Sequence, residues 1–155
     1  MELKQIKSFQ ADHDLITPGI YLSRQDGDAD TFDLRMVTPN QGNYLPIGAM
    51  HTLEHLLATF LRSGKESEHI IYVGPMGCRT GFYLITRNLP LERVLALCKE
   101  AFAFCADFSG KIPGSTRKEC GNYRSHNLPG AKKLAKAMQE VLETKQVSDM
   151  TYPTK

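Results

Sequence analysis

The 155-residue chain contains no tryptophan, and only 8% of its residues are aromatic. It also lacks any run of the ~18 consecutive apolar residues that a membrane-spanning helix requires. Its first residues, MELKQIKSFQADHDL, contain no apolar stretch of the kind found in a secretory signal peptide. These absences predict a protein that does not enter the membrane and that stays in the cytoplasm.

An excess of charge of one sign is missing as well. The 19 Lys and Arg residues nearly balance the 17 Asp and Glu residues, which gives a formal net charge of +2. A charge this small gives no reason to expect a nucleic acid or an anionic membrane surface as partner. With 41% hydrophobic residues, 12 glycines and 8 prolines, the composition excludes collagen-like and low-complexity chains. We expect one globular domain that spans residues 1–155.

Cysteine is scarce too, with four residues: Cys78, Cys98, Cys105 and Cys120. In a reducing cytoplasm they are expected to be core residues, metal ligands or reactive thiols rather than two disulfides. Cys98 and Cys105 continue the apolar stripe of a helix predicted over residues 91–104, where small thiols pack well. We therefore assign these two cysteines to the core.

The pattern of apolar residues predicts an α+β fold. Strands are expected over residues 19–23, 31–38, 69–73 and 81–86, and helices over 49–63, 91–104 and 131–145. The second strand alternates apolar and polar residues, which is typical of a half-buried strand. Residues 1–18 are expected to form an ordered arm that leads into the first strand without an element of its own, and residues 111–129 are expected to be a loop. Strands in pairs interrupted by helices predict a mostly antiparallel sheet with helices packed on one side.

The most informative motif is His51-Thr52-Leu53-Glu54-His55, on the first of the predicted helices. At ~100° per residue, the two histidines project about 40° apart, with Glu54 about 60° to the other side of His51. Histidines at positions i and i+4 can reach one divalent ion, and a nearby glutamate that is not a ligand can move protons. The alternative is a solvated helix face with two ordinary histidines.

A third metal ligand has to come from elsewhere in the chain, and Cys120 is the best candidate. It sits in an irregular stretch with no apolar period to explain its burial, and Gly121 allows a close backbone approach. Two histidines and one cysteine leave the fourth position of the metal open, which is a catalytic pattern. If His126 closed the site instead, the metal would be structural.

Cys78 is the other informative thiol. It follows the turn sequence Gly74-Pro75-Met76-Gly77 and precedes Arg79, whose charge would favour the thiolate. Such a cysteine suits acid–base or nucleophilic chemistry. A turn cysteine without a role is the alternative.

Taken together, these motifs resemble the LuxS family, the S-ribosylhomocysteine lyases. The resemblance runs in order along nearly the whole chain, through His51-Thr-Leu-Glu-His55 with Leu56-Leu57, Pro75-Met-Gly-Cys-Arg-Thr-Gly-Phe-Tyr83, Cys120-Gly121, Ser8-Phe9, Asp12-His13, Phe32-Asp33-Leu34-Arg35 and Pro39-Asn40. Several separated motifs that agree are far more specific than a single pentapeptide.

The resemblance implies a metal-dependent carbon–sulfur lyase. In such an enzyme His51, His55 and Cys120 would hold one divalent metal per subunit, iron(II) natively, with zinc or cobalt as substitutes. Glu54 and Cys78 would transfer protons. The reaction cleaves S-ribosylhomocysteine, by carbonyl migration and β-elimination, to homocysteine and 4,5-dihydroxypentane-2,3-dione. The second product is the precursor of the quorum-sensing signal autoinducer-2, and the step belongs to the activated methyl cycle.

The resemblance also implies a homodimer with two active sites at the subunit interface, to which the N-terminal segment contributes. By matched position, Ser8, His13 and Arg35 would line the substrate pocket. Two segments depart from the family pattern. Tyr72-Val73-Gly74 stands where the family commonly has Asp-Ile-Ser, which removes a carboxylate near the pocket, and Met36-Val37 stands where it often has Phe-Cys.

Other functions stay open on the residues alone. An inverzincin peptidase would need a further acidic ligand, such as Glu92 or Glu100, but 155 residues is small for a peptidase, and Cys78 and Cys120 would have no role. A metal-sensing or binding module would use His126 or Cys78 as a fourth ligand and leave no position for a substrate. A family member that has lost activity is a further possibility.

Overall fold

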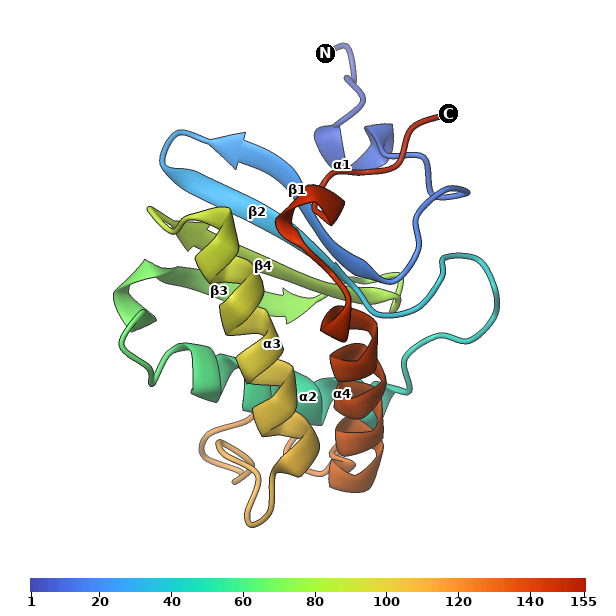
Figure 1. Cartoon of the computed structure of the whole chain (residues 1–155). Coiled ribbons are helices and arrows are strands. Elements are labelled where there is room, and N and C mark those ends of the chain that lie inside the picture. Colours follow the sequence, from blue (N-terminus) through green and yellow to red (C-terminus); the bar gives the residue numbers. More distant parts are fainter.

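The computed structural model describes residues 1–155 and contains one four-stranded sheet (Figure 1). Its strands are β1 (Gly19–Asp26), β2 (Ala29–Arg35), β3 (Ile70–Pro75) and β4 (Gly81–Arg87). Their order across the sheet is β1-β2-β4-β3, and every neighbouring pair is antiparallel. The antiparallel sheet predicted from the sequence is therefore confirmed.

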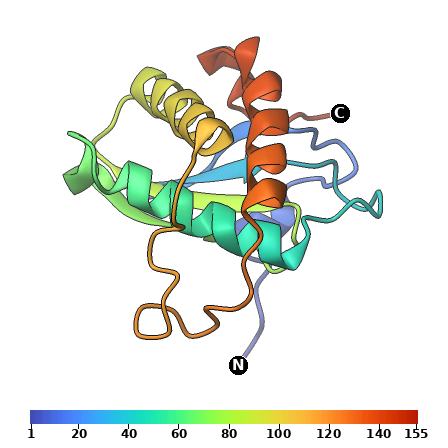
Figure 2. The same cartoon turned by 90° about the horizontal axis from the view of Figure 1, so that it is seen from below.

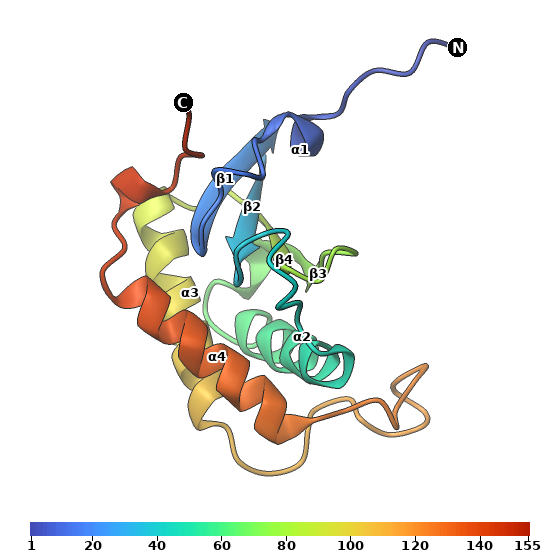
Figure 3. The same cartoon turned by 90° about the vertical axis from the view of Figure 1, so that its right-hand side faces the viewer.

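Three long helices pack on the sheet, namely α2 (Ile47–Leu61), α3 (Leu91–Asp107) and α4 (Leu128–Glu143). Helices α3 and α4 lie side by side over one face of the sheet, and α2 packs against both of them and against β3 (Figure 3). A short helix, α1 (Lys7–Gln10), lies on the other side of the sheet. The prediction of long helices on one side is confirmed, and the α+β class with it.

The core forms between the sheet and these helices. In the β2–β4 register Phe32 lies opposite Leu84 and Leu34 opposite Phe82, and all four side chains are fully buried against the helices. Full burial of side chains of this size stabilises the fold by about 1.5–3 kcal/mol each. Cys98 and Cys105 belong to this core as predicted, and burial raises the pKa of each thiol to about 12.

Three predictions about local structure were wrong. Residues 7–10 form α1 where no element was expected, and His69, expected in a strand, ends a 3-10 turn over residues 67–69. Strand β2 is not half-buried, because Asp33 and Arg35 on its polar face are as inaccessible as the apolar residues. The two side chains pair with each other, so burial of both charges is possible on a face that was expected to meet solvent.

The path of the chain brings the segment between α3 and α4 alongside α2. Seen from below, residues 108–127 leave the end of α3, pass beneath α2 and return to the start of α4 (Figure 2). Asn127 ends this segment and caps α4, because its side-chain oxygen accepts a hydrogen bond from the Gly130 backbone N–H at 2.9 Å. None of the helices combines the length and the apolar character that crossing a lipid bilayer demands.

Candidate active site

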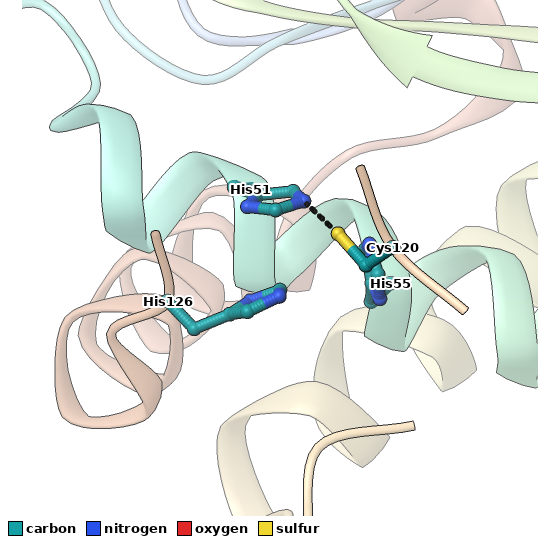
Figure 4. Close-up of side chains that lie close together, drawn as sticks. All are labelled: His51, His55, Cys120 and His126. Atoms are coloured by element: carbon teal, nitrogen blue, oxygen red, sulfur yellow. Dashed lines mark hydrogen bonds between the residues drawn. The ribbon is translucent and has the colours of Figure 1, made fainter. Parts of the chain in front are cut away.

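Four potential metal-binding side chains meet between α2 and the returning segment (Figure 4). His51 and His55 project from successive turns of α2, and Cys120 and His126 come from the segment before α4. One ligand atom from each residue lies within 4.8 Å of the corresponding atoms of the other three. Cys78 is not part of this cluster, and neither is Glu92 or Glu100, which leaves the peptidase hypothesis without its acidic ligand.

The spacing of this cluster fits a tetrahedral metal ion. His51 Nε2 and Cys120 Sγ lie 3.4 Å apart. An ion with bonds of ~2.1 Å to nitrogen and ~2.3 Å to sulfur holds two such atoms about 3.6 Å apart at the tetrahedral angle. Only a small movement would bring these two atoms into the coordination shell of one ion.

Backbone carbonyl groups orient the two helix histidines. The Ser125 carbonyl lies 2.6 Å from His51 Nδ1, and the Pro113 carbonyl lies 2.8 Å from His55 Nδ1. A carbonyl oxygen can only accept, so both Nδ1 atoms carry the proton and both Nε2 lone pairs are free to bind a metal. Gly114 allows this arrangement, because it has φ of +67° and a Cβ there would lie 3.2 Å from His55 Nδ1.

His126 reaches the cluster by a different contact. Its Nδ1 lies 2.9 Å from the hydroxyl of Thr52, which also accepts the Asn127 N–H at 2.9 Å. Its ring stacks on that of His51 with centroids 4.0 Å apart. Burial, with the charges of His51 and His55, lowers the pKa of His126 below its usual value, which favours the neutral ring.

A second group of polar side chains surrounds Cys78. The thiol is exposed and borders a cavity of about 380 Å³. Ser8, His13, Arg35 and Tyr83 also line this cavity, so the residues expected to bind substrate lie together with the expected reactive thiol. None of the four residues of the metal cluster lines it.

A chain of hydrogen bonds leads from the buried polar face of β2 to this thiol. Arg35 donates to both carboxylate oxygens of Asp33, at 3.1 and 2.6 Å, and through Nη1 to the Thr80 hydroxyl at 2.7 Å. Since that hydroxyl accepts from Arg35, its own proton is available to Cys78 Sγ, 3.1 Å away. Burial opposes the charge of Arg35, but the hydrogen bond and the charge of Asp33 outweigh it and raise the pKa of Arg35. These contacts connect the Cys78 thiol to the buried Asp33–Arg35 pair.

Arg79 does not take the place that the sequence suggested for it. It has φ of +59°, and its guanidinium group lies over the ring of Tyr44, 5.9 Å from the centroid. The cation connected to Cys78 is Arg35, which is 43 positions away in the sequence and reaches the thiol through Thr80.

Comparison with known proteins identifies the family. The family model for S-ribosylhomocysteinase (LuxS) matches residues 6–149. The chain belongs to the LuxS family. A relative named S-ribosylhomocysteine lyase in Phocaeicola vulgatus is 48% identical over 160 residues, which cover 99% of each chain. Proteins of the same name in Clostridium acetobutylicum and Porphyromonas gingivalis are 41% and 42% identical, over 97% of this chain and 99% of theirs.

The residues expected from the LuxS resemblance thus form two groups in one chain. His51, His55 and Cys120 meet at the metal cluster, and the remaining pocket residues surround Cys78. Glu54 lies half-buried on α2, one turn after His51, and none of the ion pairs of the chain involves it. Its carboxylate is therefore not neutralised by a neighbouring cation.

The segment Tyr72-Val73-Gly74, which was expected to depart from the family pattern, contains a close internal contact. Tyr72 is half exposed, and its ring lies across Gly74, where a Cβ would be 2.0 Å from the Tyr72 hydroxyl. A larger residue at position 74 would therefore require the Tyr72 ring to move. Tyr72 borders a second cavity of about 230 Å³ that shares Ser8 and Tyr83 with the cavity at Cys78.

Sequence reasoning missed several groups that shape the LuxS site. Thr80 and Asp33 support Arg35 and Cys78, and Tyr152 donates to Asp33 Oδ2 at 2.7 Å from the far end of the chain. Asp33 and Arg35 are two residues apart on a strand, and this spacing alone indicates a shared face. The carbonyl groups of Pro113 and Ser125 give no signal in the sequence, because every residue has one.

Proposed function

We propose that this LuxS-family chain cleaves S-ribosylhomocysteine to homocysteine and 4,5-dihydroxypentane-2,3-dione. The observation that carries the proposal is the pairing of two histidines and a cysteine at one centre with a separate, exposed thiol in a polar cavity. The curated relatives named S-ribosylhomocysteine lyase support the choice of substrate, since they match this chain over nearly its full length.

His51, His55 and Cys120 hold one divalent ion in this proposal, through the two Nε2 atoms and Sγ. By resemblance to the family the ion is iron(II), which zinc or cobalt can replace. When bound, it supplies a Lewis acid that stabilises negative charge developing on a substrate oxygen. The mixed nitrogen and sulfur donors suit these metals better than magnesium or calcium, which prefer oxygen.

Cys78 and Glu54 are the proton-transfer groups in this mechanism. A C–S bond breaks readily when it lies β to a carbonyl, so the carbonyl of the sugar must first move along the chain by successive enolisations. In each enolisation one group removes a proton from carbon and another returns a proton to a neighbouring atom. The Cys78 thiolate, supported by Thr80, and the unpaired Glu54 carboxylate share these two tasks. Elimination then releases homocysteine.

Ser8 and His13 bind polar groups of the substrate in the cavity at Cys78. His13 is held in place by the Ala11 carbonyl, 3.0 Å from its Nδ1, which leaves Nε2 free to face a ligand. Arg35 lines the same cavity, but its side chain is only 3% exposed and is engaged by Asp33 and Thr80. We assign Arg35 to orienting Cys78 through Thr80 rather than to a strong direct contact with substrate.

The working unit is a homodimer with two active sites at the interface. Within one chain, α1 and the segment 108–127 lie at opposite ends of the molecule (Figures 1 and 3), and the thiol cavity contains no residue of the metal cluster. A second copy can bring the thiol cavity of one protomer to the metal cluster of the other. Exposed apolar side chains support an interface, namely Phe9 (69% exposed), Ile47 (59%) and Tyr72 (51%).

We place this single catalytic domain in the cytoplasm. All four cysteines are free thiols, which suits a reducing compartment.

The deciding experiment measures homocysteine release from S-ribosylhomocysteine with a thiol reagent, using protein prepared without oxygen. We expect turnover that disappears when a chelator removes the metal and returns when iron(II), cobalt or zinc is added. Metal-loaded protein that releases no homocysteine would contradict the proposed function and would favour a family member that has lost activity.

A further inference from the structure

His126 is the one member of the four-residue cluster to which the proposed function gives no task. Its Nε2 atom is buried and has no hydrogen-bond partner in the chain. A buried nitrogen without a partner costs free energy, which a protein rarely accepts unless a ligand satisfies that atom. Two kinds of ligand could satisfy Nε2. Its lone pair could bind the metal, or its N–H could donate a hydrogen bond to a bound molecule.

The contacts of Thr52 distinguish these two cases. Its hydroxyl oxygen accepts the Asn127 N–H, and its only other partner is His126 Nδ1. Thr52 is fully buried, so no solvent is available for the hydroxyl proton. That proton is satisfied only if Nδ1 accepts it, and a neutral ring whose Nδ1 accepts must carry its own proton on Nε2.

The two helix histidines have the opposite tautomer. His51 and His55 donate from Nδ1 to carbonyl oxygens, which leaves their Nε2 atoms as lone-pair donors. Ring geometry disfavours His51 and His126 as ligands of the same ion. Two imidazoles on one tetrahedral ion have centroids about 5 Å apart, given bonds of ~2.1 Å. The His51–His55 and His55–His126 separations of 4.7 and 4.8 Å are close to that value, whereas His126 stacks on His51 at 4.0 Å with an interplanar angle of 19°. Of these two pairs, the tautomers select His51 and His55.

We propose that His126 is not a metal ligand but a substrate-binding residue, whose Nε2–H donates a hydrogen bond to a sugar oxygen that enters the space bounded by His51, His55 and Cys120. The inference rests on the proposed function, because it takes the substrate from there. It explains why a fourth potential ligand can lie at the cluster without closing it. The partner that Nε2 lacks within the chain is then the substrate itself.

The tautomer can be observed directly by NMR. In zinc-loaded protein with ¹⁵N-labelled histidine, two-bond and three-bond correlations identify the protonated nitrogen of each ring. We expect Nδ1–H at His51 and His55 and Nε2–H at His126. A spectrum with Nδ1–H at His126, and with Nε2 shifted by the metal, would overturn the inference and make the site four-coordinate.

Binding is the second test, and it uses Cys78→Ala as a background so that the substrate is not consumed. We expect His126→Leu in this background to retain one metal per chain and to bind S-ribosylhomocysteine about tenfold or more weakly by calorimetry. His126→Gln keeps an N–H near the position of Nε2 and should recover part of the affinity. His69→Leu is the matched control, since His69 bonds to the Arg87 carbonyl outside the cluster.

Each outcome of the binding test has one meaning. If the background variant binds no substrate and the parent protein releases no homocysteine, the proposed function fails and the inference fails with it. If it binds and His126→Leu binds equally well, the inference about His126 fails while the proposed function stands. Loss of metal in His126→Leu would make His126 a ligand and would likewise overturn the inference.

Thr52→Val tests the origin of the tautomer. Without the hydroxyl, nothing fixes the proton of His126 on Nε2, so we expect a mixture of tautomers in the NMR spectrum and weaker substrate binding. Thr52→Ser restores the hydroxyl and should restore the Nε2–H form. An unchanged Nε2–H signal in Thr52→Val would show that Thr52 does not set the tautomer.

Discussion

At the scale of single residues, the two accessible cysteines have separable tasks. Cys120 supplies the only sulfur of the metal cluster, whereas Cys78 lies in a cavity that contains none of the four cluster residues. We expect Cys120→Ala to lose most of its metal and all activity. Cys78→Ala should keep its metal but show no measurable turnover, since a proton-transfer group contributes about 10²–10⁴-fold to the rate.

Metal analysis beside the homocysteine assay checks both variants. Cys98→Ala in the core is the matched control, because it removes a buried thiol without touching either group. A full metal content in Cys120→Ala, or normal turnover in Cys78→Ala, would contradict the corresponding assignment.

Thr80 offers a sharper test of how the Cys78 thiol is positioned and made reactive. Its hydroxyl connects Arg35 to Cys78, so Thr80→Val breaks the contact between the cation and the sulfur. We expect iodoacetamide to modify Cys78 about tenfold more slowly at neutral pH, since a hydrogen bond to a charged group contributes ~1.5–3 kcal/mol. Thr80→Ser should react at the parent rate. The buried thiols Cys98 and Cys105 do not interfere, because burial raises the pKa of each to about 12.

At the scale of secondary structure, the β3–β4 hairpin shows which glycine the fold requires. A Cβ on Gly81 would lie 2.2 Å from the Leu34 carbonyl oxygen, whereas a Cβ on Gly77 would meet no atom within 4 Å. We therefore expect Gly81→Ala to lower the free energy of unfolding by about 2 kcal/mol or more, because strands β2 and β4 must separate. Gly77→Ala should change it little.

Thermal or urea unfolding of the metal-free proteins measures this difference. Removing the metal is necessary, since an ion bound only to the folded state would add its own stabilisation. Equal stability of Gly81→Ala and Gly77→Ala would mean that the two strands adjust more easily than their close approach indicates.

Most of the elements, but not all of the site, follow from the sequence. The period of the leucines predicts α2 within two residues at each end, and His51, Glu54 and His55 are placed correctly on it, because helical spacing is a local property. The orientation of the imidazoles depends on carbonyl groups of residues 113 and 125, and the buried Asp33 accepts a hydrogen bond from Tyr152 near the other end of the chain. Such contacts between distant segments have no periodic signal and become visible only in the folded chain.

At the scale of the whole molecule, the separation of the two groups predicts complementation between inactive chains. Cys78→Ala and Cys120→Ala should each be inactive as homodimers. If the thiol of one protomer works with the metal of the other, a mixed dimer regains one intact site. Random reassociation should then restore about a quarter of the parent activity, since half of the dimers are mixed and each has one working site of two.

Mixing the two variants after mild dissociation, or producing both chains together, provides the assay. Mixed samples without activity, in dimers shown to have exchanged, would place both groups of a site in the same chain. A chain that stays monomeric by light scattering at assay concentrations while fully active would contradict the dimer altogether.

The contact between Tyr72 and Gly74 couples the two positions in any mutational series. A serine at position 74 requires the ring of Tyr72 to swing away, because a Cβ there would otherwise lie 2.0 Å from the Tyr72 hydroxyl. Tyr72 is half exposed, so the ring can move, but it then leaves its place beside the cavity that it borders. Tyr72→Asp removes that requirement together with the ring. The effects of the two substitutions are therefore expected to be non-additive, and a library that randomises both sites at once measures this coupling.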